Sequence, residues 1–74
     1  MSIEEAFGIV IKSHREELSL SQEELAFNSG LDRTYISLLE RGKRNPTLNT
    51  LFMISKTLQV NPHSLVKEVE ILLK

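Results

Sequence analysis

Two helix signals lie close together in the first half of the chain and leave few folds open to it. Ser21 and Glu24 form a capping box, which predicts that a helix begins at Gln22. Ser29 and Gly30 follow within two turns, and glycine readily adopts the left-handed backbone conformation that ends a helix. The sequence therefore predicts a short helix followed directly by a turn.

A second short helix follows that turn. Asp32 can act as its N-cap, and the helix is expected to run to Arg41, because Gly42 can end it. The two helices, at about residues 22–41, are joined by only three or four residues, a connection typical of a helix-turn-helix. Ala26 is small enough for the point where they cross. The apolar side chains expected to point inward are Leu25, Leu31, Ile36 and Leu39.

Helix signals recur along the rest of the chain, and no stretch shows sustained strand alternation. Thr47 can cap a fourth helix, and Asn61 with Pro62 can start a fifth at about residues 62–73. We expect an all-α fold of five short helices with one core, in a single domain covering residues 1–74. The first helix should bury the stripe Ile3, Phe7, Val10, Ile11, His14 and Leu18. The fourth should bury Leu48, Leu51, Ile54 and Leu58, and the fifth should dock through Leu65, Val66, Val69, Leu72 and Leu73.

Composition argues against several classes of protein. The chain has no cysteine and only two histidines, His14 and His63, so it cannot supply the four ligands of a structural zinc site. No apolar run approaches the roughly 20 residues that span a bilayer, and no secretory leader is recognised. We expect a cytoplasmic protein without a metal, a cofactor, a membrane partner or a small-molecule ligand. Because so small a chain buries little surface, we also expect it to oligomerise.

Charge is unevenly distributed along the chain. Residues 1–31 carry two cations and six anions, residues 32–56 carry five and two, and residues 57–74 carry two and two. The three sums are therefore −4, +3 and 0. A basic segment, residues 32–56, thus lies in an otherwise acidic chain, directly at and after the predicted turn. This position favours a polyanionic partner.

The segment SQEELAFNSGLDRTYISLLERGKRNP resembles the phage repressor and Cro-like helix-turn-helix family. Within that family, LDRTYIS followed by ERGKRN is similar to the controller proteins of restriction-modification systems. The resemblance implies a compact five-helix DNA-binding domain. Two residues depart from the family pattern: Ser19 stands where glycine commonly ends the first helix, and His14 stands where leucine is usual.

The outward face of the second helix of this pair is the predicted reading face. Arg33 lies in the first turn, from which such helices reach base edges in the major groove. Arginine can bind guanine through O6 and N7, and an apolar side chain or a threonine methyl can contact a thymine methyl. The residues predicted to contact bases are Arg33, Thr34, Ser37 and Leu38.

A second group is predicted to contact the DNA backbone. Gln22 opens the first helix of the pair and corresponds to a phosphate-contacting glutamine in the family. Tyr35 can either pack against the neighbouring helix or lie on the phosphate side. The full set of predicted phosphate contacts is Gln22, Tyr35, Arg41, Lys43, Arg44 and Asn45.

Several other polar residues are interpreted as structural. Arg15 and Glu40 are expected to pair across the core, and the family's recurrent Arg and Glu at these positions imply the same. His14 is interpreted as a histidine at the edge of the core, and His63 as a surface residue. No spacing places a nucleophile beside a base, so we do not expect an enzyme.

Apolar residues left over on the last two helices predict an interface. Ile71 falls opposite the core-facing side of its helix and needs another cover. We expect a two-fold homodimer, which would place two reading helices roughly 34 Å apart on a near-palindromic site. The predicted interface residues are Phe52, Met53, Val66, Val69, Ile71 and Leu73.

The sequence therefore predicts a transcription regulator that binds operator DNA as a homodimer and controls restriction-modification genes. One alternative is a protein-interaction module with the same fold, such as an antitoxin or a regulator antagonist. The polar reading face favours DNA, and a mobility shift with DNA distinguishes the two.

Overall fold

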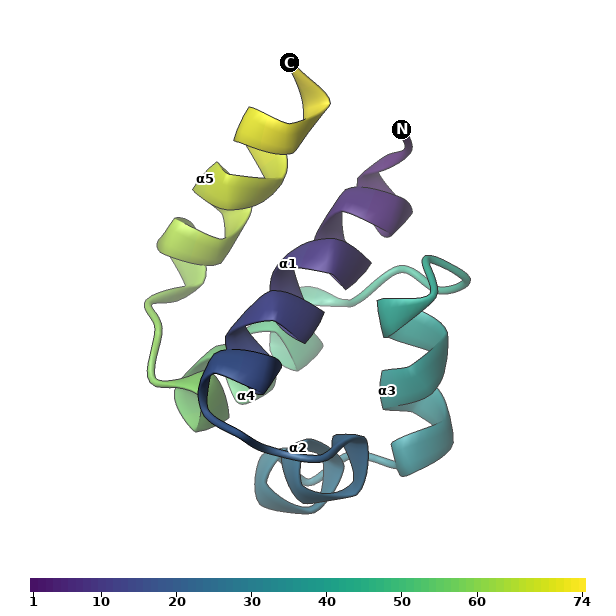
Figure 1. Cartoon of the computed structure of the whole chain (residues 1–74), viewed down its shortest axis with the longest axis vertical. Helices are drawn as coiled ribbons and strands as arrows, with labels where there is room; N and C mark the ends of the chain where they lie inside the picture. Colours follow the sequence, from purple (N-terminus) through teal and green to yellow (C-terminus); the bar gives the residue numbers. More distant parts are fainter.

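The computed structural model describes residues 1–74 and contains five α-helices. They are α1 (Ile3–Glu17), α2 (Gln22–Ser29), α3 (Arg33–Glu40), α4 (Leu48–Leu58) and α5 (Pro62–Leu73). Helix α1 packs against α3 and α5, while α2 packs against α3 and α4 (Figure 1). Both termini lie at the same end of the molecule. The predicted all-α fold with five helices is confirmed.

The helix boundaries follow from local capping. Ser21 and Glu24 form the predicted capping box, in which the Glu24 N–H donates to Ser21 Oγ at 3.0 Å and the Ser21 N–H donates to Glu24 Oε1 at 2.8 Å. Gly30 has a left-handed φ of 71° and ends α2 as predicted. Asp32 lies at the predicted N-cap position of α3, but its side chain makes no capping hydrogen bond. Thr47 caps α4 by accepting a hydrogen bond from the Thr50 N–H.

The end of α3 and the start of α1 both differ from the sequence prediction. Helix α3 ends at Glu40, one residue earlier than predicted, and Arg41 is its C-cap. Gly42 then turns the chain with a φ of 72°. At the start of α1, Ser2 and Glu5 form a second capping box that the sequence analysis did not predict. The backbone N–H of Ser2, which donates to the Glu5 carboxylate in this box, lowers the pKa of Glu5.

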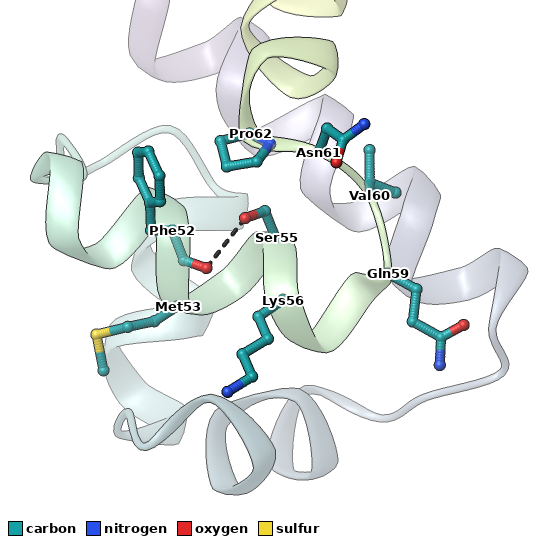
Figure 2. Close-up of a pocket in the computed structure, with 8 residues that line it drawn as sticks. All are labelled: Phe52, Met53, Ser55, Lys56, Gln59, Val60, Asn61 and Pro62. Carbon is teal, nitrogen blue, oxygen red and sulfur yellow. Dashed lines mark hydrogen bonds between the residues drawn. The ribbon is translucent and has the colours of Figure 1, made fainter.

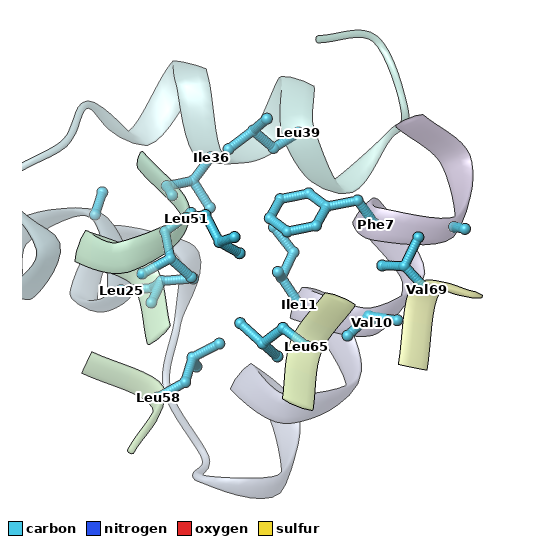
Figure 3. Packing of buried hydrophobic residues seen from close by; sticks show 13 residues of the cluster. Phe7, Val10, Ile11, Leu25, Ile36, Leu39, Leu51, Leu58, Leu65 and Val69 are labelled. Carbon is cyan, nitrogen blue, oxygen red and sulfur yellow. The ribbon is translucent and has the colours of Figure 1, made fainter. Parts of the chain in front are cut away.

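Thirteen buried hydrophobic residues from all five helices form one core (Figure 3). Four of the side chains predicted to cross or face inward in α2 and α3, namely Leu25, Ala26, Ile36 and Leu39, are buried, and Leu31 packs against this core from its edge. The α2–α3 pair is therefore fixed from behind by apolar contacts. Its opposite side remains free for polar residues.

Some residues predicted to be buried are instead exposed. Ile3 and Leu18 lie at the two ends of the α1 stripe, and Leu48, the first residue of α4, is 75% exposed. A helical angle gives the direction of a side chain but not whether a neighbouring helix covers it, and these side chains are left largely uncovered. On α5 only Leu65 and Val69 are buried, while Val66, Leu72 and Leu73 are exposed. None of the five helices combines the length and the apolar content that crossing a membrane requires.

Candidate nucleic-acid interface

The turn between α2 and α3 is held by backbone hydrogen bonds. The Gly30 N–H donates to the Phe27 carbonyl at 3.2 Å, and the Leu31 N–H donates to the Ala26 carbonyl at 2.8 Å. These bonds satisfy the last carbonyls of α2 and redirect the chain into α3. The turn thus fixes how α3 projects from the rest of the molecule.

The outward face of α3 is at least partly exposed along its length. Arg33 and Thr34, in its first turn, are exposed, and Ser37 and Leu38 are half-buried one turn later. These four residues were predicted to read bases; Thr34, Ser37 and Leu38 lie on the side of α3 away from buried Ile36, whereas Arg33 lies nearer to it, in the first turn. The face is therefore open to a groove of DNA.

A polar hollow of about 490 Å³ lies beside the start of α2. It has no apolar lining residue and is formed by Arg15, Ser21, Gln22, Glu23 and Arg33. The structure thus brings Gln22, a predicted phosphate contact, next to Arg33, a predicted base contact. Free backbone N–H groups at a helix start, together with nearby arginines, are suited to binding an anion.

The predicted pair between Arg15 and Glu40 is confirmed. Arg15 Nε donates to Glu40 Oε2 at 2.6 Å, and Arg15 Nη2 donates to Glu40 Oε1 at 3.0 Å. Glu40 raises the pKa of Arg15 through these hydrogen bonds, so the guanidinium keeps its charge although it is largely buried. The pair joins α1 to the end of α3.

A hydrogen bond that the sequence analysis missed adds Gln22 to this pair. Gln22 Nε2 donates to Glu40 Oε1 at 3.0 Å. Gln22 and Glu40 are far apart in the sequence and lie on different helices, so no periodicity connects them. Only the packing of α2 against α3 reveals the contact.

The loop after α3 carries the predicted backbone contacts. Arg41, Lys43, Arg44 and Asn45 are all exposed. The guanidinium of Arg44 lies over the Tyr35 ring, 5.5 Å from its centroid, within the range of a cation–π contact. The loop therefore presents three cations on the side of the molecule where α3 ends.

Tyr35 is half-buried and packs against the start of α4, one of the two placements considered for it. Its hydroxyl donates to Thr50 Oγ1 at 3.5 Å, and the Thr47 hydroxyl donates to the same atom at 3.1 Å. Tyr35 thus connects α3 to α4 while its ring supports Arg44.

Two further contacts were not predicted. His14 Nε2 lies 2.8 Å from Glu68 Oε2, which ties α1 to α5, and no local pattern relates residues so far apart in the chain. Gly8 lies where α1 crosses the end of α3, because a Cβ there would be 2.5 Å from the Leu39 carbonyl oxygen. A glycine in the interior of a predicted helix was the available signal for this close approach.

The predicted interface residues lie on α4 and α5. Figure 2 shows Phe52 and Met53 on α4, beside a hollow of about 580 Å³ that Pro62 closes at the start of α5. Phe52, Met53, Val66, Ile71 and Leu73 are exposed. Val69 is only 8% exposed and packs in the chain's own core, so it offers little surface to a partner.

Comparison with known proteins gives the class of this fold and site. Residues 11–65 match the family model described as helix-turn-helix. The chain therefore belongs to the helix-turn-helix family of transcription regulators.

Within that family, the chain is similar to control proteins. It is 46% identical over 61 residues to control protein C.SmaI of Serratia marcescens, which covers 82% of this chain and 73% of that protein. The crystal structure of the restriction-modification controller protein C.AhdI from Aeromonas hydrophila matches with a TM-score of 0.82 and 40% identity, covering 84% of this chain and 94% of that one. Controller protein C.Esp1396I, solved as a tetramer with its natural 35 base-pair operator, matches with a TM-score of 0.80 and 41% identity, covering 93% of this chain and 96% of that one.

Proposed function

We propose that this protein is a controller-type regulator that binds operator DNA through α3 and controls restriction-modification genes. Arg33, Thr34, Ser37 and Leu38 contact base edges. The residues that hold the DNA backbone are Gln22, Tyr35, Arg41, Lys43, Arg44 and Asn45. The protein acts in the cytoplasm, where such DNA lies.

The observation that carries this proposal is the open face of α3 with cations at both ends. Arg33 is exposed at its start, and Arg41, Lys43 and Arg44 are exposed at and after its end. Base edges in the major groove require donors and acceptors on such an open helix face, and the flanking phosphates require cations. The relatives named above include a controller protein solved in complex with its operator, which supports operator DNA as the partner of this chain.

Tyr35 has a supporting role in this proposal. Its ring carries the Arg44 guanidinium, and its hydroxyl is anchored to Thr50 on α4. A fixed arginine loses less freedom when it meets a phosphate than a freely moving one. Tyr35 therefore contributes to backbone binding by holding Arg44.

We further propose that two copies pair through the apolar side of α4 and α5. Phe52, Met53, Val66, Ile71 and Leu73 are exposed there. A second hollow, of about 240 Å³, lies between α1, α4 and α5 and is lined mainly by apolar residues that include Ile3, Leu48 and Val66. Pairing across this side leaves both α3 faces free, and a two-fold axis then directs them to successive major grooves.

A salt titration of DNA binding tests the electrostatic part of the proposal. The chain is incubated with DNA from immediately upstream of its own gene, and binding is followed by mobility shift. If each copy neutralises about three or four phosphates, the slope of log K against log salt concentration is about −5 to −7 for a dimer. A slope near zero contradicts binding through the basic segment.

Substitution of Arg33 tests the assignment of base reading. Arg33→Ala is expected to lose about 1–3 kcal/mol of binding to the preferred site and to relax the preference at one base pair. Competition between the upstream DNA and random DNA measures this change. If Arg33→Ala discriminates between the two as well as the unaltered protein does, Arg33 does not read bases.

A further inference from the structure

The polar side chain best placed to act on DNA binding without touching DNA is Glu40. We propose that Glu40 is a positioning residue: its buried carboxylate orients the Gln22 amide so that the amide faces one phosphate of the bound DNA. This inference rests on the proposed function, in which Gln22 contacts the DNA backbone. It adds a role for a residue that otherwise only pairs with Arg15.

The geometry gives Glu40 three donors from two different helices. Its side chain is 2% exposed, and it accepts hydrogen bonds from Arg15 Nε at 2.6 Å, Arg15 Nη2 at 3.0 Å and Gln22 Nε2 at 3.0 Å. Arg15 is itself fixed, because its Nη1 donates to the Leu20 carbonyl at 2.8 Å. Glu40 thus connects α1 and the end of α3 to the first residue of α2.

The chemistry of the three groups determines how the Gln22 amide is oriented. A carboxylate only accepts hydrogen bonds, so the NH₂ side of the amide, and not its oxygen, must face Glu40. One of the two N–H groups is used in this bond, and the other remains available for a phosphate oxygen. The donor is therefore oriented before DNA arrives, which reduces the ordering that binding otherwise requires.

The position of Gln22 explains why this orientation matters for DNA. Gln22 lines the polar hollow together with Arg33 from the reading helix. Since Glu40 is the last residue of α3, the same carboxylate sets the amide relative to the helix that enters the groove. The phosphate contact from Gln22 and the base contact from Arg33 are then held in a fixed position relative to each other.

A double-mutant cycle separates this role from simple stabilisation. Replacing a buried ion pair with apolar residues of similar size is often neutral or stabilising, whereas removing one partner is not. The variant Arg15→Met with Glu40→Leu therefore removes the acceptor for Gln22 without leaving a buried charge. It is compared with Gln22→Ala and with the triple variant.

The probe is a duplex that the unaltered protein selects from a random-sequence library. Circular dichroism first establishes a temperature at which every variant is folded. We expect the Arg15→Met, Glu40→Leu variant and Gln22→Ala each to weaken binding about 10- to 150-fold, the effect of losing one hydrogen bond to a charged group. The triple variant should be no weaker than Gln22→Ala, because all three changes remove the same contact.

Two results of the cycle overturn the proposal. One is that the Arg15→Met, Glu40→Leu variant binds the duplex as tightly as the unaltered protein. The other is that the pair replacement weakens binding equally with and without the Gln22 side chain, because the pair then acts independently of Gln22. If the unaltered protein selects no duplex at all, it is the proposed function that fails.

The mobility of the Gln22 side chain in the unaltered protein tests its orientation by Glu40 without variants or DNA. The chain contains two glutamines, Gln22 and Gln59, and Gln59 is exposed with no hydrogen bond from its side chain. ¹⁵N relaxation of the side-chain amides should give a high order parameter for Gln22 and a low one for Gln59 in the free protein. If the Gln22 amide is as mobile as that of Gln59, Glu40 does not position it.

Discussion

The α2–α3 pair and the α4–α5 corner are both built from two short helices, yet they present opposite surfaces. The first exposes Arg33 and Thr34, and the polar contacts of Glu40 join its two helices to each other and to α1. The second exposes Phe52, Met53 and Val66 and is supported by Leu58 and Leu65 in the core. In a chain this small, each helix pair thus supplies part of one core and one specialised outer surface.

The difference between the two surfaces matches the two partners proposed for the chain. Nucleic acid requires donors and cations held in fixed directions, and a second protein copy requires apolar area that leaves water. Phe27 is the exception on the polar side, because this α2 residue is 82% exposed. It provides a matched control for the apolar surface of α4 and α5.

The largest effect is expected where α1 meets the end of α3. A Cβ at Gly8 would lie 2.5 Å from the Leu39 carbonyl oxygen and 2.6 Å from the Glu40 carbonyl oxygen, so backbone atoms must move apart. Gly8→Ala should therefore lower the free energy of unfolding by about 2–3 kcal/mol, the usual cost of overpacking. Urea denaturation measures the loss.

Ser13→Ala is the control for this change, because Ser13 is exposed on the same helix. Its effect should stay within about 0.5 kcal/mol. If Gly8→Ala is equally mild, α1 and α3 are not held in close contact at this point.

A charge introduced on the apolar side of α5 should weaken dimer assembly without changing the stability of the folded chain. Val66 is 52% exposed, so Val66→Lys should leave the melting temperature of the single chain nearly unchanged. The dimer should weaken by about 1–2 kcal/mol, or roughly 10-fold, because a charge then replaces a buried contact. Sedimentation velocity at several concentrations measures the dissociation constant.

Phe27→Lys makes the same kind of change on the other helix pair. It removes a larger exposed apolar side chain and should not alter the dissociation constant of the dimer. An equal loss of dimer affinity in both variants indicates that the added charge, and not the α4–α5 surface, controls assembly.

A smaller effect is expected from one backbone contact on the polar side. Lys43→Ala removes an exposed cation after α3 and should weaken binding by about 1 kcal/mol per copy for all sequences alike, reducing the salt slope by about 1 per copy. Filter binding at four salt concentrations measures both quantities. Lys74→Ala, at the opposite end of the chain, should leave the salt slope unchanged. If the slope falls equally in both variants, the loss of net charge, and not the loss of a contact at Lys43, explains the change.

The same two regions differ in how far sequence predicts them. The α2–α3 pair was predicted closely, because its capping box and its glycine turn act between residues a few positions apart. Short-range hydrogen bonds and backbone conformations of this kind are encoded locally. The pairing of Arg15 with Glu40 was also predicted, from helical angles and the family resemblance.

The surface of α4 and α5 was predicted less well. Leu48 and Val66 were assigned to the core from their helical angles, but both are exposed. Their burial depends on where the neighbouring helices end, which is a property of the assembled chain. The contact between His14 and Glu68 has the same origin, since only packing brings residues 54 positions apart together.

The smallest expected effect lies at the end of α1, where the backbone itself is strained. Ser19 has a left-handed φ of 57°, which is unfavourable for a residue with a Cβ. This conformation explains why the family commonly has glycine at this position. Ser19→Gly relieves a strain of about 1–2 kcal/mol, and the greater freedom of glycine in the unfolded chain offsets about half of it.

The net gain is therefore about 0.5–1 kcal/mol in the free energy of unfolding, measured by thermal denaturation. Ser19→Ala separates backbone strain from the loss of the hydroxyl, because alanine keeps the Cβ and should bring no gain. A similar gain in both variants would place the unfavourable interaction in the serine side chain. Since α1 carries Arg15, stabilising the end of this helix would also stabilise the contact between Arg15 and Glu40 at the end of α3.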